Sequence, residues 1–228
     1  MTAAQRIIKY FALGLAVSLI VAIFSGIVFG GVGLFMAGNM VAGNSNIELT
    51  CEEQESCLMV EMSYAELEIR NGDTLAVETT DNVEIETTQN ETSLIIKEKD
   101  DFGKWFSDGK KIIVHVPKEK EFDKVGISAG AGKIYAEKIS VKKMETSLGA
   151  GEIVFGSLEA ENAKISTGVG SVEVNLASEA DKYTVKISRG IGEIRFNGEE
   201  VSNDFLTGNG DRKITISDGI GSIKVTSM

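Results

Sequence analysis

The most regular feature of the sequence is a short phrase that recurs five times in its C-terminal half. Each copy contains Ser-x-Gly-x-Gly-x, then Ile or Val, one further residue and an apolar side chain. Successive copies begin 19, 19, 22 and 29 residues apart. Repetition at such a period predicts a stack of similar units, each too small to bury its apolar side chains alone. The copies begin at Ile127, Thr146, Ile165, Ile187 and Ile216.

Apolar and polar positions alternate on both sides of each glycine pair, as in Ile153-Val154-Phe155 after it and Val185-Lys186-Ile187 before it. A period of two is that of a β-strand. After the two strands that flank a glycine pair, a third apolar segment follows in most repeats, for example Leu158 and Ala160. We therefore predict an all-β fold, a single-strand-stack β-solenoid (β-helix-like) with rungs of about 19 residues, whose regular repeats occupy residues 125–228.

The paired glycines are predicted to form the corners between strands. Glycine tolerates positive φ and lets one backbone pass close to the next. The ten predicted corner residues are Gly130, Gly132, Gly149, Gly151, Gly168, Gly170, Gly190, Gly192, Gly219 and Gly221.

Residues 60–124 are less regular, although alternation recurs in them. We predict irregular early rungs or a strand-rich cap, with an inserted aromatic loop at 100–110. Its Phe102, Trp105 and Phe106 either bind a partner or plug an open end of the solenoid, and both readings stay open. Residues 197–213 form a second excursion, and the last phrase would leave an unpaired edge unless a partner or its own charge covers it.

The N-terminal region is the only long uncharged stretch, with no Asp, Glu, Lys or Arg between Tyr10 and Ile47. It exceeds the roughly 20 apolar residues that span a bilayer, so residues 10–37 are predicted to be a transmembrane helix. Arg6 and Lys9 precede it, which places residues 1–9 in the cytoplasm and the rest outside the bacterial cell membrane. Residues 38–59 then form a tether. Cleavage near residues 41–43 is an alternative.

Gly26 and Gly30 form a GxxxG pair that allows helices to pack, but the sequence leaves the homo-oligomeric state open. From Glu48 onward there are 34 acidic and 21 basic residues. This charge argues against a nucleic acid partner and suits a soluble domain outside the membrane.

Cys51 and Cys57 either form a small disulfide loop outside the cell or remain free thiols inside it. No histidine lies near them, so they predict no metal site, and we expect no cofactor.

The segment Ile112–Pro117, the Gly-Ala-Gly corners at 130–132 and 149–151, and the strands after them resemble the bacterial putative adhesins. This family carries a domain of unknown function found in many Gram-positive proteins. The resemblance covers roughly residues 60–228. It implies adhesion or envelope binding, with some members linked to envelope-stress systems, and it supplies no catalytic residues.

Other side chains of the phrase have a structural and a functional interpretation. The serine of each copy should stack into a column, which either binds backbone at the corner or offers hydroxyls to sugars. The residues after each glycine pair form a mixed row that we expect to be solvated. The serines are Ser128, Ser147, Ser166, Ser188 and Ser217, and the row is Lys133, Glu152, Ser171, Glu193 and Ser222.

Catalysis finds little support in the sequence. His115, the single histidine, lies in an alternating strand, and the glycines lack the ending of a phosphate loop. Carboxylates such as Glu173 and Glu193 could pair as in glycoside hydrolases, although any acidic solenoid offers such pairs.

We therefore expect a membrane-anchored, non-catalytic surface binding, adhesion or scaffold module whose partner is a membrane protein or an envelope glycan. The first alternative is an accessory of an envelope-stress sensing system that works through a membrane partner. The second is a carbohydrate-active solenoid enzyme.

Overall fold

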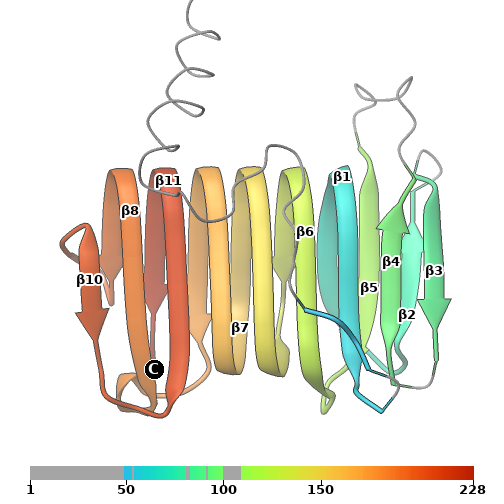
Figure 1. The fold of residues 1–228 in the computed structure, drawn as a ribbon, viewed down its shortest axis with the longest axis horizontal. Coiled ribbons are helices and arrows are strands. Elements are labelled where there is room, and N and C mark those ends of the chain that lie inside the picture. The colour runs from blue at the N-terminus through green and yellow to red at the C-terminus, as the bar shows by residue number, and fades with distance from the viewer. Residues whose placement is uncertain (1–48, 53, 81–82, 91, 100–108) are drawn as a thin grey trace, which may run out of the picture. The chain divides into compact units, whose positions relative to one another are not determined.

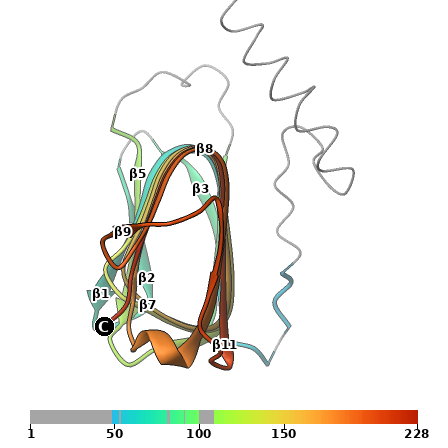
Figure 2. The ribbon, with the colours of Figure 1, turned by 90° about the vertical axis from the view of Figure 1, so that its left-hand side faces the viewer.

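The structure is a computed structural model that describes residues 49–52, 54–80, 83–90, 92–99 and 109–228. Almost all of the secondary structure in these residues is β-strand, with one turn of 3-10 helix, η1 (Ala180–Lys182). The strands form one sheet that winds into a stack of rungs (Figure 1). Each full rung rises along one leg, turns through an arch and returns along a second leg, so the rungs lie behind one another when seen along the stack (Figure 2).

Four long strands build the regular part of this stack. They pair in parallel, so that identical positions of successive phrases lie side by side; Ser128 pairs with Ser147, and Gly132 with Gly151. This is the arrangement that the repeated phrase predicts. The four strands are β6 (Glu121–Ala136), β7 (Ile139–Leu176), which contains two corners, β8 (Tyr183–Phe196) and β11 (Arg212–Thr226).

A further complete rung, β1 (Cys57–Gly72), lies beside β6 although it has no glycine at its corner. Tyr64 pairs with Ala131, and Ala65 occupies the position that Gly132 has in the next rung. The regular stack therefore begins well before residue 125, within the part of the chain that the sequence marks as irregular.

The N-terminal end of the stack is closed by four short strands. β4 (Leu94–Glu98) and β5 (Lys111–Pro117) pair in parallel with the two legs of β1 and together make a divided rung. β3 (Ile85–Gln89) and β2 (Ala76–Thr79) then pair with β4 and β5 in the antiparallel sense. This end of the stack therefore combines one divided parallel rung with two antiparallel strands.

The order of the rungs differs from their order in the sequence. The sheet runs β10-β8-β11-β7-β6-β1-β4-β3, so the last phrase lies between the third and the fourth (Figure 1). Ser217 of β11 pairs with Ser166 on one side and with Ser188 on the other. The expectation that the last phrase leaves an unpaired edge is wrong, because β11 has a neighbour on both sides.

The outer rung is β8, and the 197–213 excursion covers it. β9 (Glu199–Glu200) and β10 (Asp204–Thr207) pair with β8 in the antiparallel sense. The rings of Phe196 and Phe205 lie 5.2 Å apart and pack against the core. Antiparallel strands therefore border the parallel stack at both ends, which keeps its long parallel rungs from being open edges.

The core lies inside the coil, and inward positions of every leg contribute to it. The apolar patch that follows most corners is buried as well, for example Leu158 and Ala160 at 0% and 1% exposure. The fold is thus all-β, with a sheet of mainly parallel strands that is not closed. The predicted transmembrane helix at 10–37 lies outside the described residues. Within the described residues, no helix has the length and apolar composition needed to cross a bilayer.

Candidate functional site: the ridge on the glycine corner

The second glycine of each pair meets two requirements that only glycine satisfies. All five have φ between +134° and +153°, a range that other residues rarely adopt. A Cβ atom on Gly221 would lie 1.6 Å from the carbonyl oxygen of Gly170 in the neighbouring rung. The glycines therefore allow backbones to stack at the corner.

Between the two glycines of each pair, and at the equivalent position Tyr64 of β1, one side chain points outward, and these side chains form a line across the stack. We call this line the apolar ridge. Three of its members are exposed large hydrophobic residues: Tyr64 at 48%, Val169 at 41% and Ile191 at 65%. In spatial order the ridge is Tyr64, Ala131, Ala150, Val169, Ile220 and Ile191.

The ridge has the properties of a contact surface rather than of a catalytic cleft. Neighbouring strands lie about 4.8 Å apart, so its six members extend over about 24 Å. Contiguous apolar surface, unlike single scattered hydrophobic residues, is typical of an interaction site. The glycine corner beneath holds them in fixed register.

At the N-terminal end of the ridge, a buried ion pair lies where other rungs have their glycine corner. The Lys110 ammonium lies 3.3 Å from the Glu98 carboxylate, and the two side chains are only 8% and 3% exposed. Glu98 also accepts hydrogen bonds from the backbone N–H groups of Ser63 and Tyr64, at 2.8 and 3.0 Å. Glu98 thereby fixes the corner of β1, which has no glycine.

The predicted aromatic loop connects β4 to β5, next to this ion pair in the sequence. Phe102, Trp105 and Phe106 lie outside the described residues, so their role as partner-binding residues stays a prediction.

The residue directly before the first glycine of each phrase faces inward, and in two rungs this residue is charged. Ala129 and Leu148 occupy this position in the first rungs, and Thr167, Asp218 and Arg189 follow in spatial order. Asp218 is only 4% exposed. Burial raises the pKa of its carboxyl group to about 6, although the backbone amides of Ile220 and Gly219 and the charge of Arg189 oppose the shift.

The five serines do form a column, in the spatial order Ser128, Ser147, Ser166, Ser217 and Ser188. Ser166 donates a hydrogen bond to the backbone oxygen of Thr146, 3.4 Å away in the adjacent rung. This contact fits the structural interpretation of that serine.

Two residues of the row that follows the glycine pairs form an ion pair with each other. Lys133 lies 2.7 Å from Glu152, and this contact raises the pKa of the half-exposed Lys133 side chain. Such an exposed ion pair contributes little to stability.

The carboxylates considered for glycoside cleavage do not face each other. Glu173 forms an ion pair with Lys224 at 2.8 Å, and Glu193 forms one with Arg195. β11 lies between the rungs of the two glutamates. His115 faces Glu78 on β2, with its Nε2 atom 3.5 Å from the carboxylate. These side chains do not form an acid–base pair with each other.

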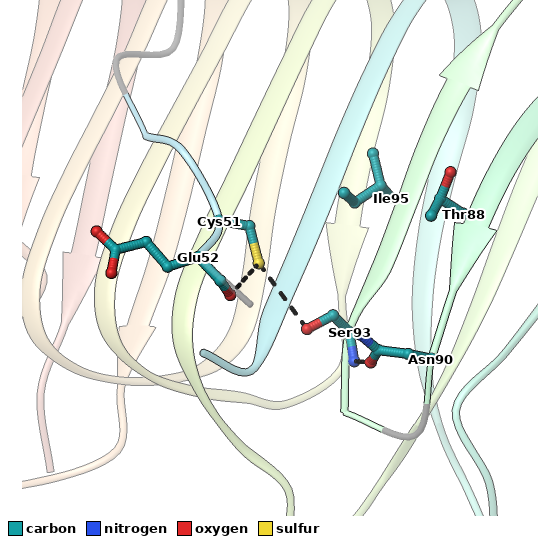
Figure 3. Close-up of a pocket in the computed structure, with 6 residues that line it drawn as sticks. All are labelled: Cys51, Glu52, Thr88, Asn90, Ser93 and Ile95. Carbon is teal, nitrogen blue, oxygen red and sulfur yellow. Dashed lines mark hydrogen bonds between the residues drawn. The ribbon is translucent and has the colours of Figure 1, made fainter. Parts of the chain in front are cut away.

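Cys51 and Cys57 form a disulfide, with their Cα atoms 6.0 Å apart. Beside it lies an open hollow of about 150 Å³ lined by Cys51, Glu52, Thr88, Asn90, Ser93 and Ile95 (Figure 3). The Ser93 hydroxyl accepts a hydrogen bond from the Cys57 N–H and donates one to the Glu55 carbonyl oxygen. This polar group therefore holds the disulfide segment against β4.

Among the residues that the structure describes, no group of three or more His, Cys, Asp or Glu could hold a metal ion. The apolar ridge is the site that sequence reasoning missed. Its signal was present, because the residue between the glycines becomes larger along the phrases, from Ala131 and Ala150 to Val169 and Ile191.

Residues 44–227 match the family model described as Toastrack DUF4097. The chain belongs to this family. The predicted membership of a family that carries a domain of unknown function is confirmed by this match. None of the curated proteins matches the sequence.

One similar structure is a "putative cell adhesion protein" from Clostridium sporogenes, with 17% identity and a TM-score of 0.53, covering 76% of this chain and 93% of that chain. This likeness shows that the Toastrack fold is shared. A "putative adhesin" from Bacteroides fragilis has 14% identity and a TM-score of 0.33, covering 75% and 92%. A "putative lipid binding protein" from Parabacteroides distasonis has 15% identity and a TM-score of 0.23, covering 76% and 92%.

Proposed function

We propose that this protein is a membrane-anchored, extracytoplasmic binding module without catalytic activity, and that it holds a protein of the cell envelope along the apolar ridge. The observation that carries the proposal is the line of aliphatic side chains formed by exposed Val169 and Ile191 with half-buried Ile220 between them. They project from a backbone that stacked glycines hold rigidly, so little conformational entropy is lost when a partner docks.

Two further observations support this proposal. The similar structure from Clostridium sporogenes is named as a cell adhesion protein, which suits a binding role. The uncharged stretch from Tyr10 to Ile47 precedes the module in the sequence and suits an anchor that keeps the ridge near the membrane. Aliphatic side chains fit an apolar protein surface better than a sugar, which stacks on aromatic rings.

The test is site-specific photocrosslinking of the full-length protein in its native membrane. A photoreactive residue replaces Ile191 in one variant and Leu206 in another. These positions are matched, with 65% and 66% exposure on adjacent strands, but only Ile191 belongs to the ridge. We expect a discrete crosslinked protein from position 191 alone, and its loss when Val169 and Ile220 are changed to Ser.

Equal crosslinking from both positions, or none from position 191, would overturn the proposal. A third variant with Trp105→Ala and Phe106→Ala shows whether the aromatic loop contributes to the same contact. Recovery of a membrane signalling protein as the crosslinked partner would favour the sensing accessory over a surface adhesin.

A further inference from the structure

A second surface, on the first legs of the three rungs at the C-terminal end, carries lysines without acidic partners. Three outward positions on each of β7, β11 and β8 form a grid of nine side chains, which we call the basic panel. None of the nine is acidic. The panel consists of Asn162, Lys164 and Ser166 on β7, Lys213, Thr215 and Ser217 on β11, and Thr184, Lys186 and Ser188 on β8.

The three lysines of the panel differ from most other cations of the fold. Lys164, Lys186 and Lys213 are all exposed, and none lies within ion-pair distance of a described carboxylate. On the returning legs of the same stack, by contrast, Lys133 and Lys224 each contact a glutamate at 2.7–2.8 Å. The lysines of the panel are therefore available to an external anion.

The insertion of β11 creates the spacing of the panel. Thr215 pairs with Lys164 on one side and with Lys186 on the other. If β8 lay directly beside β7, these two lysines would be neighbours about 4.8 Å apart and would repel each other. Thr215 instead separates them by about 9.6 Å, and Lys213 lies diagonally about 8 Å from each.

The surrounding charge favours an anion at this place over the rest of the surface. Residues 44–120 contain 18 acidic and 8 basic side chains, whereas residues 121–228 contain 16 and 13. At physiological ionic strength charges are screened over about 8 Å, so the panel acts locally despite the net negative charge of the protein. Glu145, Asp204 and Asp211 lie at its margins and limit its extent.

We propose that the basic panel binds a linear, phosphate-bearing polyanion. The lysine ammonium is a compact point charge that suits phosphate oxygens. The three ammonium groups are spread over an exposed face of the stack. They therefore suit successive phosphates of a chain better than a single enclosed ion. The side chains of Asn162, Thr215 and Ser217 offer further donors. By contrast, the hydroxyl groups of Ser166 and Thr184 already donate to backbone oxygens. This site lies below the apolar ridge, and the inference is independent of the function proposed for the ridge.

The test measures binding of long-chain inorganic polyphosphate to the full-length protein in non-ionic detergent. Each lysine near an anionic surface contributes about fivefold in affinity, so Lys164→Gln, Lys186→Gln and Lys213→Gln together should weaken binding about a hundredfold. The matched control carries Lys97→Gln, Lys133→Gln and Lys224→Gln, which lower the net charge equally at paired lysines. It should bind within about threefold of wild type.

A second arm replaces polyphosphate by poly(glycerol phosphate) of equal phosphate number. Tighter binding of one polymer identifies the source of the phosphate chain, and either result supports the panel. Three results would overturn the proposal. They are equal losses of affinity in the control and the panel variant, binding of neutral dextran as strong as that of polyphosphate, and no binding of either polymer by wild type. Urea unfolding of both variants verifies that they are folded, and unchanged crosslinking from position 191 separates this site from the ridge.

Discussion

The carboxyl group of Asp218 should make the stability of this protein depend on pH in a direction opposite to that of most carboxylates. Asp218 lies inside the stack between Thr167 and Arg189 and is 4% exposed. Burial raises its pKa from 3.8 to about 6, so the folded protein binds a proton more tightly than the unfolded chain does. Its contribution to stability is present at low pH and is lost as the pH rises through about 6.

The magnitude follows from the two pKa values. One pKa unit corresponds to about 1.4 kcal/mol, so the complete shift corresponds to about 3 kcal/mol. The carboxyl group of the unfolded chain is already mostly ionised at pH 4.5. By thermodynamic linkage, the free energy of unfolding should therefore fall by about 2 kcal/mol from this group between pH 4.5 and pH 7.5. Asp218→Asn removes the titration but keeps the size of the side chain.

The assay is urea unfolding of wild type and Asp218→Asn at the two pH values. The free energy of unfolding of the variant, relative to wild type, should rise by about 2 kcal/mol from pH 4.5 to pH 7.5. Asp211→Asn, which removes an exposed carboxylate just before β11, serves as the control. A relative stability of Asp218→Asn that is flat or falls with pH would refute the reasoning.

Two further predictions concern the corners of the stack. Gly221→Ala should lower the free energy of unfolding by more than about 3 kcal/mol or prevent folding, because its Cβ would meet the Gly170 carbonyl oxygen at 1.6 Å. Gly198→Ala, where φ is +86° and the space is open, should cost about 1 kcal/mol. Equal losses in urea unfolding would contradict this prediction. Lys110→Met should destabilise by about 3–5 kcal/mol because Glu98 would be left buried without its cation. Hydrogen exchange of the Ser63 and Tyr64 amides should then accelerate, and unchanged exchange would count against the role of Glu98 at this corner.

The coil could be predicted from the sequence because its determinants are local. The glycine pairs specify where the backbone turns, and the alternation on either side specifies which side chains face inward. β1 was harder to recognise because Tyr64 and Ala65 stand where other rungs have a residue and a glycine. Its corner depends on Glu98, which is 34 residues away from Tyr64 in the sequence. No local pattern reveals such a contact.

The order of the rungs could not be predicted for the opposite reason. The paired positions of the phrases are nearly identical, so any phrase fits beside any other. The differences lie in the buried column, where Asp218 is placed between Thr167 and Arg189, and in the 29-residue interval before the last phrase. That interval supplies the cap on β8 and returns the chain to the gap beside β7. The basic panel depends on this order and could not be predicted from the sequence. The apolar ridge could be, because its members are the residues between the paired glycines.

The measurement that tests the central feature of the fold most directly is disulfide trapping between outward positions of adjacent rungs. A disulfide needs Cα atoms closer than about 7 Å. Thr215→Cys combined with Lys164→Cys, or with Lys186→Cys, should crosslink under mild oxidation because these residues pair in the sheet. Lys164→Cys with Lys186→Cys should not, because β11 separates them by about 9.6 Å. Efficient trapping of the 164–186 pair, without trapping of 164 to 215, would show that the phrases stack in sequence order and would contradict the account.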